Sequence, residues 1–231
     1  TKLSHTKVEL TYNLMRTFVA GLAFAMPFSL VYQMMSDRMK GQQKSEKVIK
    51  GLPFAAGFTA GTAVSIAGNM HYVIYAQIIP LIEKLTGKEV SSYWFPDATR
   101  YIGYNPYREE DRTIHEFPCY SFVLGDLHAH VVNIMFVLLV IAFLYVWLRG
   151  VRKKTVPVET SMKDGKFWKE QLLMTHLLVI SALLGMFQWT NFWDFVIYYV
   201  VTLGTVLFAN IIRFQGKIKK IDVVTFSQMA E

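Results

Sequence analysis

Long uncharged stretches constrain this chain more than any other feature of its sequence. Histidine aside, residues 51–82 contain no acidic or basic side chain, and the only one within residues 171–212 is Asp194. A helix needs about 20 mostly apolar residues to cross the hydrocarbon core of a bilayer. These stretches are long enough to do so, and a hydrophobic content of 53% fits a membrane protein better than a soluble domain.

Five transmembrane helices are expected. Residues 12–35 and 131–148 supply one each. Residues 51–82 are longer than one span needs, so this helix is tilted, kinked near its glycines or extended past the membrane. Residues 171–212 supply two spans, separated by the polar sequence QWTNFWD at 188–194. The predicted fold class is therefore an all-α integral membrane protein.

Basic residues follow the first, third and fifth predicted spans. Sixteen of the 24 Lys and Arg lie at residues 36–50, 149–170 and 213–231. Strict alternation puts these loops on one side, and the positive-inside rule makes that side cytoplasmic. Residues 83–130 then form an outer loop, and the break at 188–194 also lies outside. This pattern explains the net charge of +7 without nucleic acid as a partner.

The sequence HEFPCYSFVLGDLHAHVVN, at residues 115–133, gathers acids and histidines at the outer end of the third span. Two roles are open for Asp126. It is a helix N-cap at the positive end of the dipole, or a general base that takes a proton from a hydroxyl nucleophile. Glu116 is the second candidate acid; it forms a hydrogen-bonded pair with His115 or is solvated.

His128 and His130 form an H-x-H pair. In an extended chain both imidazoles would point the same way and would suit one divalent metal ion. On a helix they diverge by about 200 degrees. Because a span follows directly, a helix is favoured and a metal is disfavoured. Hydrogen bonds to the neighbouring loop are the other role, and no further cofactor is implied.

Two more outer segments carry candidate binding residues. Asp194 follows Asn191 and Trp193 at the start of the fifth span, where it is an N-cap or, as an acid at the membrane edge, a functional residue. The aromatic loop at 91–112 predicts a short interfacial helix from Pro96, which would bring Arg100 to the lipid phosphates. A surface arginine near anionic lipid is the alternative for Arg100.

Topology brings these segments to one membrane face, so the acids and histidines of 115–133 are expected to converge with Asp194. Asn69 and His71, inside the second predicted span, are expected to form helix-to-helix hydrogen bonds. Small residues of the same span, Gly57 and Gly61 among them, have spacings that let helices pack closely in lipid.

Several of these motifs resemble one known family. HEFPCYSFVLGDLHAHV resembles the EFP-F-SF-L-GDLHPH signature of the "YYY" multi-pass membrane proteins of bacteria and archaea, a domain of unknown function. TNFWDF resembles the N-x-WDFP signature of that family, and YWFPDATRYI its W...SR-I segment. This chain departs from the family at Ala129 and Val196, where the family usually has proline. The family's amino-terminal motif would precede Thr1, so residues 1–231 are expected to be one transmembrane domain of a longer protein.

The family is grouped with the GT-C glycosyltransferases, which use a carboxylate in an outer loop to transfer a sugar from a polyprenyl-phosphate carrier outside the membrane. The resemblance thus implies a GT-C-like fold in a bacterial or archaeal cell membrane. It implies that Asp126 or Glu116 is a catalytic acid or base, and that the upstream chain completes the site. It also implies a set of substrate-binding residues: Arg100, His128, His130, Asn191, Trp193 and Asp194.

Two other functions stay open. A non-catalytic membrane subunit would use the same polar residues as caps and loop clamps. A transporter of lipid or solute would need a polar pathway through the spans, for which His71 and His176 are the main candidates.

Overall fold

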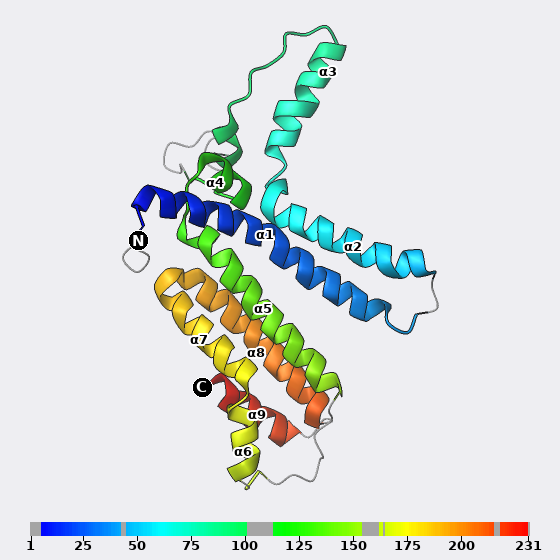
Figure 1. The fold of residues 1–231 in the computed structure, drawn as a ribbon, viewed down its shortest axis with the longest axis vertical. Coiled ribbons are helices and arrows are strands. Elements are labelled where there is room, and N and C mark those ends of the chain that lie inside the picture. Colours follow the sequence, from blue (N-terminus) through cyan, green and yellow to red (C-terminus); the bar gives the residue numbers. More distant parts are fainter. Residues whose placement is uncertain are drawn as a thin grey trace. The chain divides into compact units, whose positions relative to one another are not determined.

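The computed structural model describes residues 6–42, 45–100, 113–153, 162–163, 165–214 and 218–230. Every regular element in these ranges is a helix (Figure 1). The residues pack as two compact units, which meet in sequence between Val131 and Val132.

Unit 1, the amino-terminal unit, is built around two long antiparallel helices followed by shorter ones. Its elements are α1 (Val8–Met39), α2 (Glu46–Thr62), the π-helical segments η1 (Ala63–Ala67) and η2 (Val73–Ile78), α3 (Ile79–Leu85), the 3₁₀ turn η3 (Phe95–Thr99) and α4 (Pro118–Leu124). The turn η3 begins next to Pro96, the predicted start of the interfacial helix. The last residues of that predicted helix fall outside the described ranges.

Glycines bring α1 and α2 together, as their spacing predicts. A Cβ at Gly57 would lie 2.8 Å from the carbonyl oxygen of Phe28, and one at Gly61 would lie 2.9 Å from that of Phe24. The rings of Phe24 and Phe58 meet edge to face, with centroids 5.8 Å apart. Without a side chain at the two glycines the backbones approach closely, which is the usual basis of helix packing in lipid.

Gly61→Val is expected to lower the free energy of unfolding by about 1–3 kcal/mol, because the new side chain meets backbone atoms of α1 that cannot swing aside. Gly51→Val, on the same helix, is the matched control, since a Cβ there meets nothing within 4 Å. Thermal unfolding of both variants in detergent checks the prediction. Equal destabilisation of the two would show that the close approach does not hold α1 against α2.

The second predicted span is broken at its glycines. After η1, Gly68 adopts φ 55° and ψ −145°, and Met70 follows with a positive φ of 64°. The chain resumes at η2 and α3, so 51–82 is not one continuous helix. The kink near the glycines is therefore confirmed.

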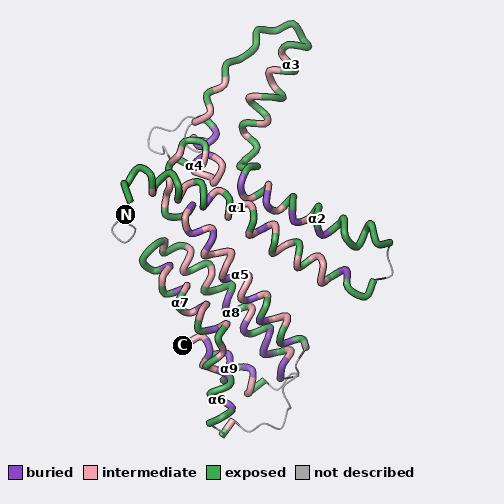
Figure 2. Tube along the Cα trace, in the orientation of Figure 1, coloured by how far each residue is buried: buried purple, intermediate pink, exposed green. Residues whose placement is uncertain are grey.

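Three helices of the described ranges are long and apolar enough to cross a membrane: Val8–Met39, Ala129–Arg152 and Phe192–Phe214. The pair Gly165–Leu172 and Thr175–Thr190, bent by 52°, makes a fourth if it counts as one span. Large apolar residues such as Leu14, Phe18 and Val200 are exposed on these helices, as expected for lipid contact. Figure 2 shows exposed positions along α1 and α8. The count of five spans stays a prediction.

Unit 2, the carboxyl-terminal unit, packs α5 (Ala129–Lys153) from Val132 onward with α6 (Gly165–Leu172), α7 (Thr175–Thr190), α8 (Phe192–Phe214) and α9 (Ile218–Met229). Its main core lies between α5, α7 and α8 and includes Val140, Leu184 and Val206. The predicted polar break is confirmed at Asn191, a single extended residue between α7 and α8.

Candidate functional site

The candidate site in unit 1 begins with a tight turn after α4. Phe117 is extended, Pro118 opens the helix, and Gly125 ends it with φ +76°. This left-handed conformation favours glycine. The backbone N–H groups of Gly125 and Asp126 both donate to the carbonyl oxygen of Ser121, at 2.9 and 3.0 Å. The turn therefore reverses the chain just before Asp126.

Two residues of α1 hold this turn. The hydroxyl of Tyr12 donates to the carbonyl oxygen of Gly125 at 3.1 Å and accepts the N–H of Leu127 at 2.9 Å. The guanidinium of Arg16, one helical turn further on, occupies the space where a Cβ of Gly125 would lie. Tyr12 and Arg16 thus fix the backbone on both sides of Asp126.

His128 lies between two carboxylates. Its Nε2 is 3.0 Å from Oε2 of Glu116 and 3.0 Å from Oδ2 of Asp126. The Nε2 atom is shielded from solvent, and neither contact has the angles of a hydrogen bond. The Asp126 side chain is 61% exposed whereas that of Glu116 is 21% exposed. Glu116 is therefore the sheltered partner of the imidazole, and Asp126 is the carboxylate open to solvent.

The two histidines lie together, contrary to the expected divergence. The rings of His128 and His130 are nearly parallel, with centroids 5.7 Å apart. The reason is that α5 begins only at Ala129, so His128 precedes the helix. The same boundary means that Asp126 lies too far upstream to be the N-cap residue. In the part of the chain that the structure describes, no three His, Cys, Asp or Glu side chains are arranged to hold a metal ion.

Residues at the break in the second predicted span contact the loop that precedes the acid and histidine cluster. Asn69 donates from Nδ2 to the carbonyl oxygen of Ala98 at 2.5 Å, and His71 Nδ1 lies 3.1 Å from the hydroxyl of Tyr93. The expected helix-to-helix partners are thus replaced by partners in the 86–100 segment. The Phe117 ring covers Gly68, where a Cβ would lie 2.6 Å from it. The position of Glu116 therefore depends on this break.

Arg100 lies half-buried at the end of η3. Its guanidinium stacks 4.5 Å from the ring centroid of Trp94. Its Nη1 is shielded from solvent and has no hydrogen-bond partner among the described residues. Nε2 of His115 is also shielded from solvent and has no hydrogen-bond partner among the described residues. The backbone N–H of His115 donates to the carbonyl oxygen of Thr99 at 2.7 Å. Buried unpaired donors of this kind favour an anionic ligand.

Partial burial shifts the pKa of two side chains near the cluster, Tyr93 and Cys119. Burial, followed by the nearby charge of Asp97 and by Tyr72, raises the pKa of the Tyr93 hydroxyl, so the group stays neutral and able to donate. Burial also raises the pKa of the Cys119 thiol in α4.

Cys119, the only cysteine of the chain, is expected to react slowly with iodoacetamide in the folded protein. A raised pKa leaves less thiolate, which is the reactive form, so the rate should keep rising to higher pH than it does for the unfolded chain. The same protein in denaturant serves as the control. A native rate and pH profile equal to those in denaturant would contradict the burial of α4.

The candidate residues of unit 2 form a separate cluster at the start of α8. Oδ2 of Asp194 accepts Nδ2 of Asn191 at 3.0 Å and Nδ2 of Asn133, from α5, at 2.9 Å. Asp194 lies in the first turn of the helix, where the dipole stabilises a negative charge, and Asn191 immediately precedes the helix. The Trp193 side chain is 72% exposed, as expected for a residue at a membrane interface.

The structure thus groups the predicted residues in three places. Glu116, Asp126, His128 and His130 form one cluster, Arg100 lies on η3, and Asn191 and Asp194 form the cluster of unit 2. Sequence reasoning missed Tyr12, although its spacing of four from Arg16, the one charge in that span, is a signal. Because Asp126 belongs to unit 1 and Asp194 to unit 2, their convergence stays a prediction.

Comparison with known proteins gives a family and no more detailed relationship. The family model described as "Uncharacterized membrane protein (DUF2298)" matches residues 1–229. No curated protein and no solved structure matches the chain. The match covers nearly the whole sequence, and the structure contains several helices suited to a bilayer. The chain therefore belongs to the DUF2298 family of uncharacterized membrane proteins.

Proposed function

We propose that this protein is a membrane glycosyltransferase-like enzyme that uses a polyprenyl-phosphate-linked sugar at the outer face of the cell membrane. The observation that carries the proposal is the position of His128 Nε2, 3.0 Å from the carboxylates of both Glu116 and Asp126. A carboxylate can take the proton of a hydroxyl nucleophile, and two carboxylates meet here at one imidazole.

Asp126 acts as the base in this reaction because it is the more exposed of the two acids. Its carboxylate takes the proton of an acceptor hydroxyl, whose oxygen then attacks the anomeric carbon of the sugar. The bond from that carbon to the phosphate oxygen breaks, and its electron pair leaves with the polyprenyl phosphate. His128 keeps the two acids at one point, because its Nε2 lies 3.0 Å from the carboxylates of both Glu116 and Asp126.

Arg100 supplies the contact to the phosphate. Its solvent-shielded Nη1 has no partner among the described residues, and a guanidinium fork matches phosphate oxygens. Stacking on Trp94 holds the guanidinium plane in place. A buried cation gains more from an anion than an exposed one, because water screens it less.

His130 is the remaining candidate of the unit 1 cluster, and it contacts the sugar. His130 stacks on His128 and faces the same cluster. Asn191 and Asp194 are held by their mutual hydrogen bond and present polar groups beside the exposed Trp193. Because Asn191, Trp193 and Asp194 belong to unit 2, their contact with the sugar stays a prediction. The concentration of Lys and Arg after the first, third and fifth predicted spans supports an outer location for all of these residues.

Assay of the full-length protein with a panel of polyprenyl-phosphate hexoses tests the proposal. The wild type is expected to transfer sugar, and Glu116→Gln is expected to lose roughly 10- to 100-fold in turnover because the charge next to His128 is removed. Glu89→Gln, at an exposed outer-loop position, is the matched control. Failure of the wild type with every donor would rule out this function, and equal rates in both variants would remove Glu116 from the reaction.

A further inference from the structure

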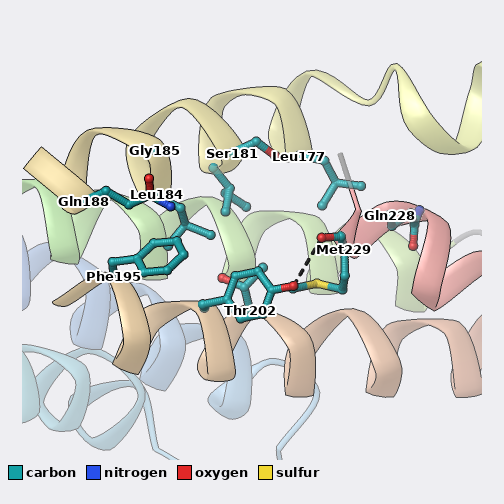
Figure 3. A pocket seen from close by; sticks show the side chains of 11 residues that line it. Leu177, Ser181, Leu184, Gly185, Gln188, Phe195, Thr202, Gln228 and Met229 are labelled. Atoms are coloured by element: carbon teal, nitrogen blue, oxygen red, sulfur yellow. Dashed lines mark hydrogen bonds between the residues drawn. The ribbon is translucent and has the colours of Figure 1, made fainter. Parts of the chain in front are cut away.

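A cavity of about 230 Å³ lies in unit 2 between α7, α8 and α9 (Figure 3). Its walls are mostly apolar side chains, including Leu177, Leu184 and Phe195, and its polar lining comes from neutral residues such as Ser181 and Thr202. No acidic or basic side chain is among the described residues that line it. The volume exceeds the roughly 150 Å³ cavity that takes up a molecule of benzene size. The cavity therefore suits an uncharged, largely apolar group.

The hydroxyl of Thr202 has no hydrogen-bond partner among the described residues, although its side chain is only 3% exposed. A threonine inside a helix usually donates to the carbonyl oxygen four residues earlier. Thr205 on the same helix does so, with a bond of 2.9 Å to the carbonyl oxygen of Val201. Thr202 lines the cavity and keeps its donor free. Since a buried unsatisfied donor is costly, this hydroxyl calls for an acceptor in the cavity.

The end of the cavity formed by α9 is fixed and neutral. The side-chain amide of Gln228 accepts Nδ2 of Asn210 at 2.9 Å and donates to the backbone carbonyl of Gln171 at 3.0 Å. The hydroxyl of Tyr199 donates to the carbonyl oxygen of Met229 at 3.3 Å, and Figure 3 shows this bond beside the cavity. These bonds hold the α9 end of the cavity in place, and Thr202 keeps a hydroxyl that no described residue uses.

The walls belong to helices suited to the membrane interior. α8 is a candidate span, and α7 is the longer arm of the bent pair. Gly185 and Gln188 on the rim are exposed. An occupant that reaches this rim comes from the surrounding hydrocarbon, where lipid is the most abundant molecule. The small volume suits one apolar group with a single hydrogen-bond acceptor. A packed helix would instead need a continuous apolar surface along several helical turns.

We propose that this cavity binds a neutral lipid, namely an apolar chain that carries an uncharged acceptor oxygen, either an alcohol or an ester carbonyl. The chain fills the space between Leu177, Leu184 and Phe195, and the oxygen accepts the hydrogen bond of Thr202. This proposal does not depend on the sugar-transfer function, because it uses other residues and a different unit.

Photolabelling of the full-length protein in membranes tests this assignment. Three diazirine probes of equal chain length are compared: a fatty alcohol, a monoacylglycerol and a hydrocarbon without oxygen. Labels are expected on peptides of α7 and α8 that line the cavity, with stronger labelling by an oxygen-bearing probe. Labelling by the alcohol alone or by the ester alone would identify the source of the acceptor, and absence of label from these peptides would overturn the proposal.

Two pairs of variants separate cavity volume from the hydrogen bond. Gly185→Leu fills the rim and should reduce labelling of the cavity by all three probes about tenfold or more. Gly204→Leu is the matched control, because Gly204 lies on α8 away from the cavity, and it should leave labelling unchanged. A Cβ at either glycine meets nothing within 4 Å. Gly185→Ala is the milder variant if leucine prevents folding, with a smaller reduction in the same direction. Unchanged labelling of the folded Gly185 variants would contradict binding in the cavity.

Thr202→Val keeps the shape of the side chain and removes the donor. It should reduce labelling by the oxygen-bearing probes about three- to tenfold and leave the hydrocarbon probe unchanged. Thr205→Val is the matched control, since its hydroxyl is already bonded to its own helix. An equal reduction of all three probes by Thr202→Val would overturn the role of its hydroxyl.

Discussion

Asp126→Asn is expected to lower the turnover of sugar transfer by about 10²- to 10⁴-fold, the usual contribution of a general base. The amide has nearly the same shape as the carboxylate but cannot take a proton from the acceptor hydroxyl. It also removes one of the two negative charges beside His128, whose Nε2 lies 3.0 Å from Oδ2 of Asp126. Because the donor is bound through other residues, the loss should appear in kcat more than in KM.

Asp97→Asn is the control for this variant, since Asp97 is an exposed acid of the same outer loop and lies outside the cluster. It is expected to keep the wild-type kcat. Initial rates at several donor concentrations separate kcat from KM for the two variants. Unchanged turnover of Asp126→Asn would exclude Asp126 as the base, and a matching loss in Asp97→Asn would indicate a general effect of charge on the loop.

Gly68→Ala is expected to lower the free energy of unfolding by about 3 kcal/mol or more and to reduce activity as well. The conformation of Gly68, φ 55° and ψ −145°, strains any residue with a Cβ. The new methyl group would also lie 2.6 Å from the ring of Phe117. Phe117 is the neighbour in sequence of Glu116, the sheltered acid beside His128, so a displaced ring is expected to disturb Glu116 as well.

Gly87→Ala is the control that introduces backbone strain without a contact such as the one between residue 68 and the Phe117 ring. Gly87 also has a positive φ, +71°, but a Cβ there meets nothing within 4 Å. It should cost only about 1–2 kcal/mol and leave activity unchanged. Chemical unfolding in detergent and the transfer assay provide the two readouts. Equal effects of both variants would contradict the coupling of the broken span to the acid cluster.

The helical class and the main breaks of the fold follow from the sequence because lipid imposes simple requirements. Uncharged runs become helices, and the kink near the glycines of 51–82 occurs at Gly68. The polar break before Asp194 occurs at Asn191. The number of spans is harder to predict, because hydropathy alone does not say where a long apolar run turns. The run 51–82 divides into α2, η1, η2 and α3.

The candidate site was only partly predictable. The acids and histidines of 115–133 were recognisable as a group, but their geometry depends on where α5 begins. A start at Ala129 leaves His128 outside the helix, so its ring stacks on His130 and reaches both carboxylates. The contact of Tyr12 with the turn at Gly125 joins residues 113 apart, and no local pattern predicts such a contact.

The most direct test of the central claim is an experimental structure of the full-length protein with a phosphonate analogue of a polyprenyl-phosphate sugar, whose carbon–phosphorus bond resists transfer. The account predicts that the anomeric carbon lies beside the carboxylate of Asp126, that His128 remains between Asp126 and Glu116, and that the phosphonate contacts Arg100. A donor bound at another place, with the cluster of Glu116, Asp126 and His128 in contact only with protein, would contradict it.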